Sequence, residues 1–314
     1  MQFIDPGAGR ANIATMKKKV VGLGEVLWDV LPERKCLGGA PANFSYIATL
    51  MGDEGIVASR VGEDSLGVEA LCRMRELGLT IDHVQKDRNH ATGTVNVELD
   101  SAGLARYQIA HPAAWDFLEW TAEWRGLAAQ ADAVCFGSLA QRDEESRSTI
   151  RRFVEAAAPT AVVIFDANLR QSYYSREVLA ESMSLADIVK LNDEELPKVM
   201  TSHGISHENE QASAQWLLGT YQLEMVCITR GGRGSLLLRG GEASEHSGFR
   251  VRVADTVGSG DAFTAGLMHQ YMQGAPLDRM NEVANRMGAW VASKVGATPT
   301  LKGDSLKELL AQIG

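Results

Sequence analysis

The residues best suited to chemistry lie in one short stretch, 255–266, which reads Asp-Thr-Val-Gly-Ser-Gly-Asp-Ala-Phe-Thr-Ala-Gly. Gly258 and Gly260 flank Ser259 and allow a sharp turn, so consecutive backbone N–H groups can point at one spot. The apolar pattern that follows predicts a helix beginning at about Ser259, whose positive end favours an anion there. Asp261 could accept the proton of an attacking hydroxyl while the amides stabilise charge on a phosphate. The stretch predicts phosphoryl transfer, although in isolation it fits a helix-stabilising first-turn acid equally well.

A second set of polar residues lies near the N-terminus. Gly38 and Gly39 precede a predicted helix at 41–51 and permit close approach of the backbone to a ligand. Asn43 brings both a donor and an acceptor to the same place. Asp29 lies at the carboxyl end of the first predicted strand and could accept hydrogen bonds from sugar hydroxyls, with a loop cap as the alternative. These residues are our candidate substrate contacts.

Other motifs are weaker on their own. Asn192 to Glu195, Asn-Asp-Glu-Glu, begins a predicted helix, where acidic residues are ordinary. The glycine-rich run at 229–234 fits either a basic phosphate or ribose loop or a tight hairpin turn. The run at 22–27 has two glycines of a dinucleotide fingerprint and lacks the third, so a Rossmann dehydrogenase is a weak alternative. The motifs of P-loop enzymes and protein kinases are absent from the sequence.

Strand–helix pairs repeat along the chain and predict a parallel sheet covered by helices on both faces. Ligands of such a sheet bind at the carboxyl ends of its strands. The predicted pairs are 20–30 with 41–51, 55–61 with 64–77, 131–137 with 144–157, 161–165 with 176–182, and 187–191 with 194–200; a strand at 225–229 follows a helix near 211–218.

One region departs from this pattern. Segments 92–99 and 104–110 alternate in polarity around turn residues at 100–103, which predicts a β-hairpin. Because an isolated hairpin is marginally stable, we expect it to pair with the extended segment 30–38 and form a small sheet over the mouth of the main body. Such a sheet would act as a lid or as an interface.

Composition narrows the possible functions. The 314 residues include 31 basic and 40 acidic ones, a formal charge of −9, which disfavours non-specific binding of nucleic acid. No apolar run approaches the roughly 18 residues of a membrane span, and four scattered cysteines suggest neither zinc nor disulfides. We expect a cytoplasmic protein with a disordered extension at 1–15 and one domain at 16–314.

These motifs, in this order, resemble the ribokinase-like, or PfkB, carbohydrate kinase family over about residues 18–300. The resemblance rests on the paired glycines at 38–43, Asn-x-x-Glu at 192–195, and the highly specific signature D-T-x-G-[AS]-G-D at 255–261. It implies an α/β three-layer sandwich with a mostly parallel central sheet and a small β-sheet lid. It also implies ATP and Mg²⁺ as cofactors, and a homodimer formed through the lid.

The resemblance assigns roles to individual residues. Asp261 would be the general base, and the amides of Gly258, Ser259 and Gly260 would form the anion hole. The family also implies that Asn192 and Glu195 influence the placement of magnesium and phosphate. It implies that Thr229, Gly231 and Gly234 contact the nucleotide. A monovalent cation (K⁺) would bind at Asp255, Val257 and Gly296.

Within the family, the stretches at 24–32, 37–43, 136–140 and 296–299 look like bacterial fructokinases. The sequence therefore predicts ATP-dependent phosphorylation of a primary hydroxyl of a small sugar, D-fructose to fructose 6-phosphate, with Trp28 able to pack on a sugar face. Arg170 suits a substrate carboxylate and keeps 2-keto-3-deoxygluconate open as the alternative substrate. Another sugar kinase of the same family is a further alternative. A non-catalytic sugar or nucleotide sensor is a distant alternative, because Asp261 and both glycines are present.

Overall fold

The computed structural model describes residues 17–30, 34–99, 105–206 and 208–301, together with 308, 309 and 311. The extension expected at 1–15 lies outside this part, as does the turn expected at 100–103. No helix in the described part is long and apolar enough to cross a membrane.

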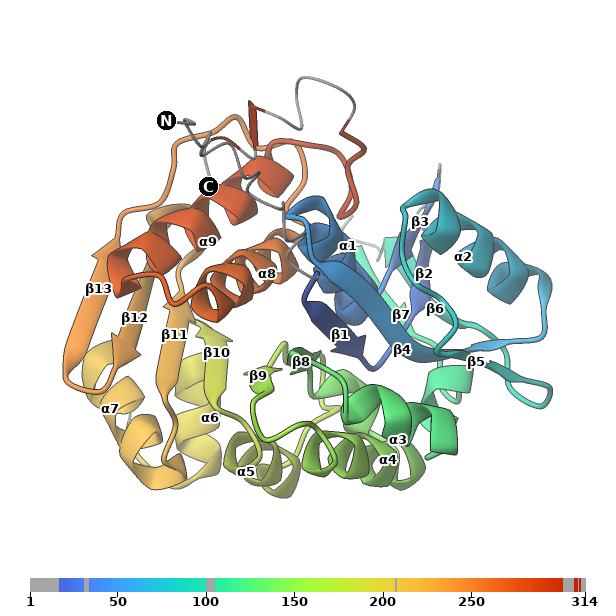
Figure 1. The fold of residues 1–314 in the computed structure, drawn as a ribbon, viewed down its shortest axis with the longest axis horizontal. Helices are drawn as coiled ribbons and strands as arrows, with labels where there is room; N and C mark the ends of the chain where they lie inside the picture. The colour runs from blue at the N-terminus through green and yellow to red at the C-terminus, as the bar shows by residue number, and fades with distance from the viewer. Residues whose placement is uncertain are drawn as a thin grey trace, which may run out of the picture.

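Within the described residues, the main sheet has nine strands in the order β13-β12-β11-β10-β9-β8-β1-β4-β5 (Figure 1). Neighbours from β11 to β5 are parallel, whereas β12 and β13 extend one edge in antiparallel pairing. This confirms the mostly parallel sheet. The strands are β1 (Lys19–Leu23), β4 (Glu54–Gly62), β5 (Val84–Asp87), β8 (Ala133–Phe136), β9 (Val162–Asp166), β10 (Ile188–Asn192), β11 (Met225–Thr229), β12 (Ser235–Arg239) and β13 (Glu242–His246).

Helices cover both faces of the main sheet and complete a three-layer sandwich (Figure 1). The central strands run apolar because both of their faces are buried. One face packs against α1 (Ala40–Leu50), α2 (Ser65–Glu76), α8 (Ser259–Met272) and α9 (Leu277–Ala292), and the other against α3 (Ala122–Ala128), α4 (Glu144–Glu155), α5 (Arg176–Ser184), α6 (Glu195–Ser202) and α7 (Glu210–Tyr221).

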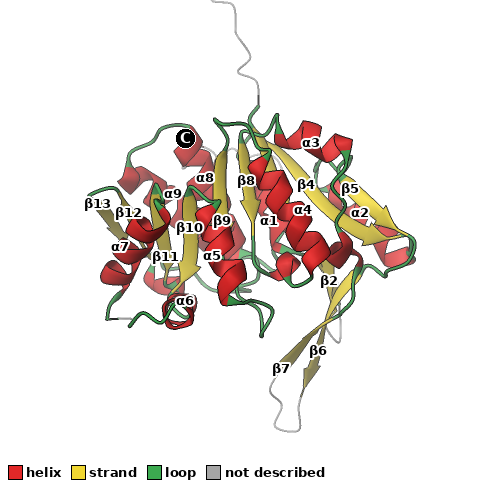
Figure 2. Ribbon diagram, turned by 90° about the horizontal axis from the view of Figure 1, so that it is seen from below, coloured by secondary structure: helices red, strands yellow, loops and turns green. Residues whose placement is uncertain are grey.

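A separate small sheet has the order β3-β2-β6-β7. Its strands are β2 (Leu27–Val30), β3 (Lys35–Gly38), β6 (Gly93–Leu99) and β7 (Ala105–Ile109). Strand β2 pairs with β3 antiparallel and with β6 parallel. The hairpin therefore pairs with 27–30, and most of the predicted partner 30–38 joins the same sheet on the far side of β2, as β3. Figure 2 shows β6 and β7 projecting from the body of the molecule.

The single strand predicted at 20–30 is wrong, because two strands in different sheets occupy it. The chain leaves β1 after Leu23, and Gly24, with φ of 141°, donates its amide to the Ala58 carbonyl at 3.0 Å. The continuous apolar run conceals this break. Strands β5, β12 and β13 and helices α3 and α9 were also not predicted.

Candidate active site

A cavity of about 860 Å³ lies between the small sheet and the carboxyl ends of the main strands. Most of the predicted site residues line it, as expected for a parallel sheet. Gly38 and Gly234 do not line it. The predicted residues in its wall are Asp29, Gly39, Asn43, Arg170, Asn192, Glu195, Thr229, Gly231, Asp255, Val257, Gly258, Ser259, Gly260, Asp261 and Gly296.

Helix α8 begins at Ser259, where the sequence predicted it. Its N-cap, Gly258, has φ of 76°, and a side chain there would collide with Ala297. The Ala262 amide donates to the Gly258 carbonyl at 2.9 Å. The Ser259 amide donates to the Thr256 carbonyl at 3.2 Å, whereas the Gly260 and Asp261 amides precede the first hydrogen bond of the helix and can bind an anion in the cavity.

Asp261 meets Asn43 at the cavity wall. The Asn43 Nδ2 donates to the Asp261 Oδ2 at 2.8 Å. Burial and the neighbouring charge of Asp166 raise the pKa of Asp261 to about 6, while the Asn43 hydrogen bond, Lys190 and Arg170 oppose that rise. Asp261 is thus ionised at neutral pH and has the proton affinity of a useful general base.

Asn43 also keeps a free acceptor. The residue is 4% exposed, and its Oδ1 has no hydrogen-bond partner among the described residues. A buried acceptor left without a partner is costly, so a ligand hydroxyl would be a favourable donor to it. Asn43 can therefore hold the base with one atom and a substrate with the other.

Glu25 fixes the start of the helix that carries Asn43. Helix α1 has no side-chain cap at Gly39, and the Ala40 amide donates instead to the Glu25 Oε1 at 3.3 Å. Gly39, with φ of 102°, lies against the Glu25 carbonyl, where a side chain would collide. Glu25 is 3% exposed, and burial raises its pKa to about 7. We did not predict this residue, although an acid directly after a buried strand was a signal.

Asp29 faces the cavity from β2 of the small sheet. Burial raises its pKa to about 6, with Arg170 lowering it and Asp255 raising it further. A side chain at Gly38 would collide with the Asp29 carboxylate, so Gly38 makes room for a candidate contact without being one. The predicted sugar contact of Trp28 is wrong, because its buried indole donates to the Leu66 carbonyl at 3.0 Å.

Asn192 and Glu195 form a reciprocal cap at the start of α6. The Asn192 Oδ1 accepts from the Glu195 amide at 2.8 Å, and the Glu195 Oε2 accepts from the Asn192 amide at 2.8 Å. The Glu195 Oε1 accepts from the Leu169 amide, also at 2.8 Å. Both carboxylate oxygens are therefore engaged, and Glu195 positions the loop that carries Arg170.

Asp255 joins two loops at the cavity rim. Its Oδ1 accepts from the Val257 amide at 3.0 Å, and its Oδ2 accepts from the Gly296 amide at 3.1 Å. Arg34, beside β3, lies 3.4 Å from the same Oδ2. The three residues predicted to hold a monovalent cation are thus brought together by one carboxylate.

The family model for pfkB family carbohydrate kinases matches residues 24–302. The chain belongs to this family. A fructokinase from Escherichia coli is 31% identical to this kinase, over 91% of this chain and 97% of the relative.

Two solved structures extend the comparison. Fructokinase from Vibrio cholerae O395, in a form bound to fructose, ADP and calcium ion, is 26% identical and covers 94% of this chain and 99% of that chain, with a TM-score of 0.77. An uncharacterized sugar kinase from Pyrococcus horikoshii, in complex with ATP, is 25% identical. The match covers 92% of this chain and 97% of that chain, with a TM-score of 0.76. The ribokinase-like fold and the carbohydrate kinase class are thereby confirmed.

The loop after β11 divides into two parts. Thr229 and Gly231 line the cavity of the kinase, whereas Gly234 turns the chain from β11 into β12. Gly234 has φ of 85°, and a side chain there would collide with the His246 carbonyl. The tight turn therefore explains why residue 234 is glycine. Because Gly234 does not line the cavity, the structure does not support the nucleotide contact predicted for it.

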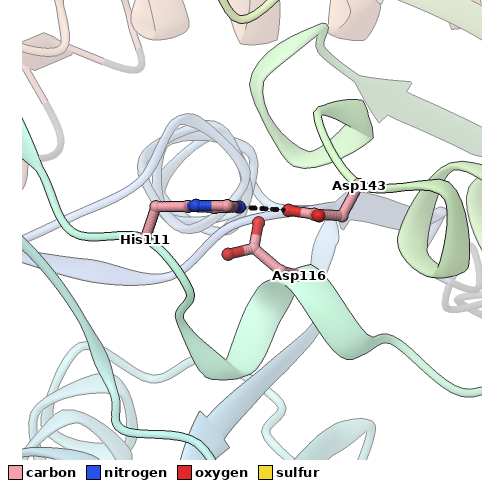
Figure 3. A group of neighbouring side chains, drawn as sticks. All are labelled: His111, Asp116 and Asp143. Carbon is pink, nitrogen blue, oxygen red and sulfur yellow. Dashed lines mark hydrogen bonds and ion pairs between the residues drawn. The ribbon is translucent and has the colours of Figure 1, made fainter.

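A second group of possible metal ligands lies outside this cavity. His111, Asp116 and Asp143 approach one another (Figure 3), and the His111 Nε2 lies 2.8 Å from the Asp143 Oδ2. Arg142, however, donates to both Asp116 oxygens at 2.7 Å and stacks over Trp115. The guanidinium neutralises Asp116, so the group is better explained as an ion-pair network than as a metal site.

Proposed function

We propose that this kinase transfers the γ-phosphoryl group of ATP to a primary hydroxyl of a sugar, with Asp261 as the general base. The observation that supports this most strongly is the Asn43–Asp261 pair beside the N-terminus of α8 in one cavity. The sugar oxygen would attack the γ-phosphorus, the bond from that phosphorus to the bridging oxygen would break, and the hydroxyl proton would pass to Asp261. The amides at Gly258–Gly260 would stabilise the transferring group.

The proposed acceptor is D-fructose, which becomes fructose 6-phosphate. The relatives named as fructokinases support it. So does the wall of the cavity, where Asp29 and the free Oδ1 of Asn43 can accept hydrogen bonds from neutral hydroxyls. A carboxylate held beside Asp29 would be repelled.

A second candidate, 2-keto-3-deoxygluconate, is favoured by Arg170. This residue lines the cavity and donates a hydrogen bond to the Leu169 carbonyl at 3.3 Å, and no carboxylate of the described residues lies within ion-pair distance of it. A guanidinium so placed can bind a substrate carboxylate.

The test is kcat/KM for fructose, 2-keto-3-deoxygluconate, ribose and adenosine under one condition. Fructose should be preferred, and a preference of about tenfold or more for another substrate would overturn the assignment. Arg170→Gln separates the candidates, because it should lower kcat/KM much more for the acidic sugar than for fructose. No turnover of ATP with any sugar would instead point to a different acceptor class.

The metal sites are also proposals. Magnesium bound to ATP would neutralise phosphate charge, and Glu195 would act on it through water, because both of its oxygens accept backbone amides. Potassium would bind backbone oxygens near Asp255, Val257 and Gly296, which the Asp255 carboxylate holds together.

We further propose that residues 16–314 act as one domain in which the small sheet is a lid, and that the kinase is a homodimer assembled through that sheet. Leu27, Val95 and Ile109 line the cavity from three of its strands, which supports contact with a bound sugar. Sedimentation velocity measures the assembly state, and a monomer at all concentrations would contradict the dimer.

A further inference from the structure

Lys190 is a buried cation in the wall of the candidate active site. It lies in β10, it is 6% exposed, and it lines the cavity. Its Nζ donates to the two Asp166 oxygens at 3.0 and 3.1 Å. An ammonium group has three N–H donors, so among the described residues one donor remains beyond the Asp166 carboxylate.

Lys190 lies next to the first turn of α8. A Cβ built on Gly260 would stand 3.2 Å from the Lys190 Nζ, which places the ammonium beside the backbone proposed to bind phosphate. Thr264, one turn further along α8, donates to the Asp166 Oδ2 at 2.8 Å and so links the ion pair to the same helix. The absence of a side chain at residue 260 leaves the ammonium open toward the cavity.

The charge on Lys190 is permanent at any working pH. Burial alone lowers its pKa, but Asp166, Glu195 and Asp261 more than offset this and hold the pKa above its ordinary value. A fixed charge in a site of low dielectric interacts strongly with charge that develops during reaction.

We propose that Lys190 is a further catalytic residue, whose remaining N–H donates to a peripheral oxygen of the phosphoryl group during transfer. This inference rests on the proposed reaction at Asp261. The competing explanation is that Lys190 only neutralises the buried Asp166, because an unpaired buried charge is strongly destabilising.

The two explanations differ in the variant Lys190→Met/Asp166→Asn, which removes both charges of the buried ion pair. We expect kcat at about pH 8.5 to fall by about 10²-fold in Lys190→Met and in the double variant, with the KM for sugar changed much less. The control is Lys198→Met, on the exposed side of α6, which should behave like the parent. A double variant within about threefold of the parental kcat would overturn the proposal.

Gly260→Ala provides a test that does not depend on folding of the charge variants, because Gly260 lies in the first turn of α8 without a left-handed φ. Its methyl group would stand 3.2 Å from the Lys190 Nζ and crowd the ammonium, so kcat should fall by about tenfold or more. An unchanged kcat would contradict the proposal. Asp261→Asn, assayed in parallel, separates the role of Lys190 from the proposed function. If Asp261→Asn is inactive while the double variant is fully active, only the role of Lys190 is wrong. If Asp261→Asn is active, Asp261 is not the general base.

Discussion

Asn43 and Asp261 share a hydrogen bond of 2.8 Å although 218 positions separate them in the chain. The bond joins the first turns of α1 and α8, which pack against each other. Asn43 thereby orients the carboxylate that would remove the sugar proton. Because Asn43 lines the cavity and its Oδ1 has no hydrogen-bond partner among the described residues, we expect substrate binding and base placement to depend on one side chain.

Asp261→Asn should lower kcat by about two to four orders of magnitude, because an amide cannot take the hydroxyl proton. Binding of ATP and sugar should persist, since the change is isosteric. Stopped assays give kcat, and calorimetry gives binding. Asp143→Asn, which alters a carboxylate outside the cavity, is the control. Turnover within about threefold of the parent would show that Asp261 is not the base.

Asn43→Ala should move the acid limb of the kcat profile to higher pH. In the parent this limb should lie at about pH 6, where Asp261 becomes protonated as the pH falls. The Asn43 hydrogen bond favours the ionised carboxylate and lowers its pKa, so removing the bond raises the pKa. The measurement is kcat at saturating substrates from acidic to alkaline pH. If the acid limb stays at the same pH, the Asn43 hydrogen bond does not influence the pKa of the base.

Glu25→Gln should stabilise the protein at about pH 8 and much less at about pH 5. Burial raises the Glu25 pKa from 4.5 to about 7, so the native state resists an ionisation that the unfolded chain undergoes. In the parent, the contribution of Glu25 to the free energy of unfolding is fully present below pH 4.5 and is lost as the pH rises through about 7. The loss is about 3 kcal/mol.

Urea denaturation of parent and variant at the two pH values measures this difference. Glu145→Gln, which changes an exposed acid in the first turn of α4, is the matched control and should show no comparable dependence on pH. An equal gain at both pH values would mean that Glu25 is not buried as a titrating acid.

Sequence reasoning found the parts of the site that lie at strand ends. Asn43, Asn192 and Asp261 lie at the end of a strand or the start of a helix, and the carboxyl ends of parallel strands meet at one edge of a sheet. That rule predicts that these residues lie at the same edge of the sheet, but it does not predict which side chains contact each other. Asp29 reaches the cavity instead from β2 of the small sheet. The contact between Asn43 and Asp261 depends on how α1 and α8 pack, which no local pattern encodes.

Glu25 and Lys190 were missed for a related reason. Each is a charged residue in or beside an apolar run that predicts a buried strand, and a buried charge requires a partner. The partners, the Ala40 amide and Asp166, are supplied by other elements. The sequence therefore contained the signal, a charge where burial was expected, but not the identity of the group that satisfies it.

The small sheet should become more protected from hydrogen exchange when sugar binds. Val95 in β6 and Ile109 in β7 line the cavity, so a bound sugar would hold these strands against it. Closure would exclude water that could otherwise accept the phosphoryl group. Exchange of 93–99 and 105–109 should slow with fructose, while the β12–β13 hairpin serves as the internal control. Equal exchange with and without sugar would rule out a lid.

Potassium should raise kcat at fixed ionic strength. The Asp255 carboxylate accepts the Val257 and Gly296 amides, which brings two backbone segments together beside the Gly258 turn. A cation held by carbonyls of those segments would stiffen the anion hole, and potassium suits such oxygen ligands better than a bulky organic cation does. The measurement compares potassium chloride with tetramethylammonium chloride at equal concentration. Asp255→Ala should abolish the response, because it frees both segments, and a flat response in the parent would reject the site.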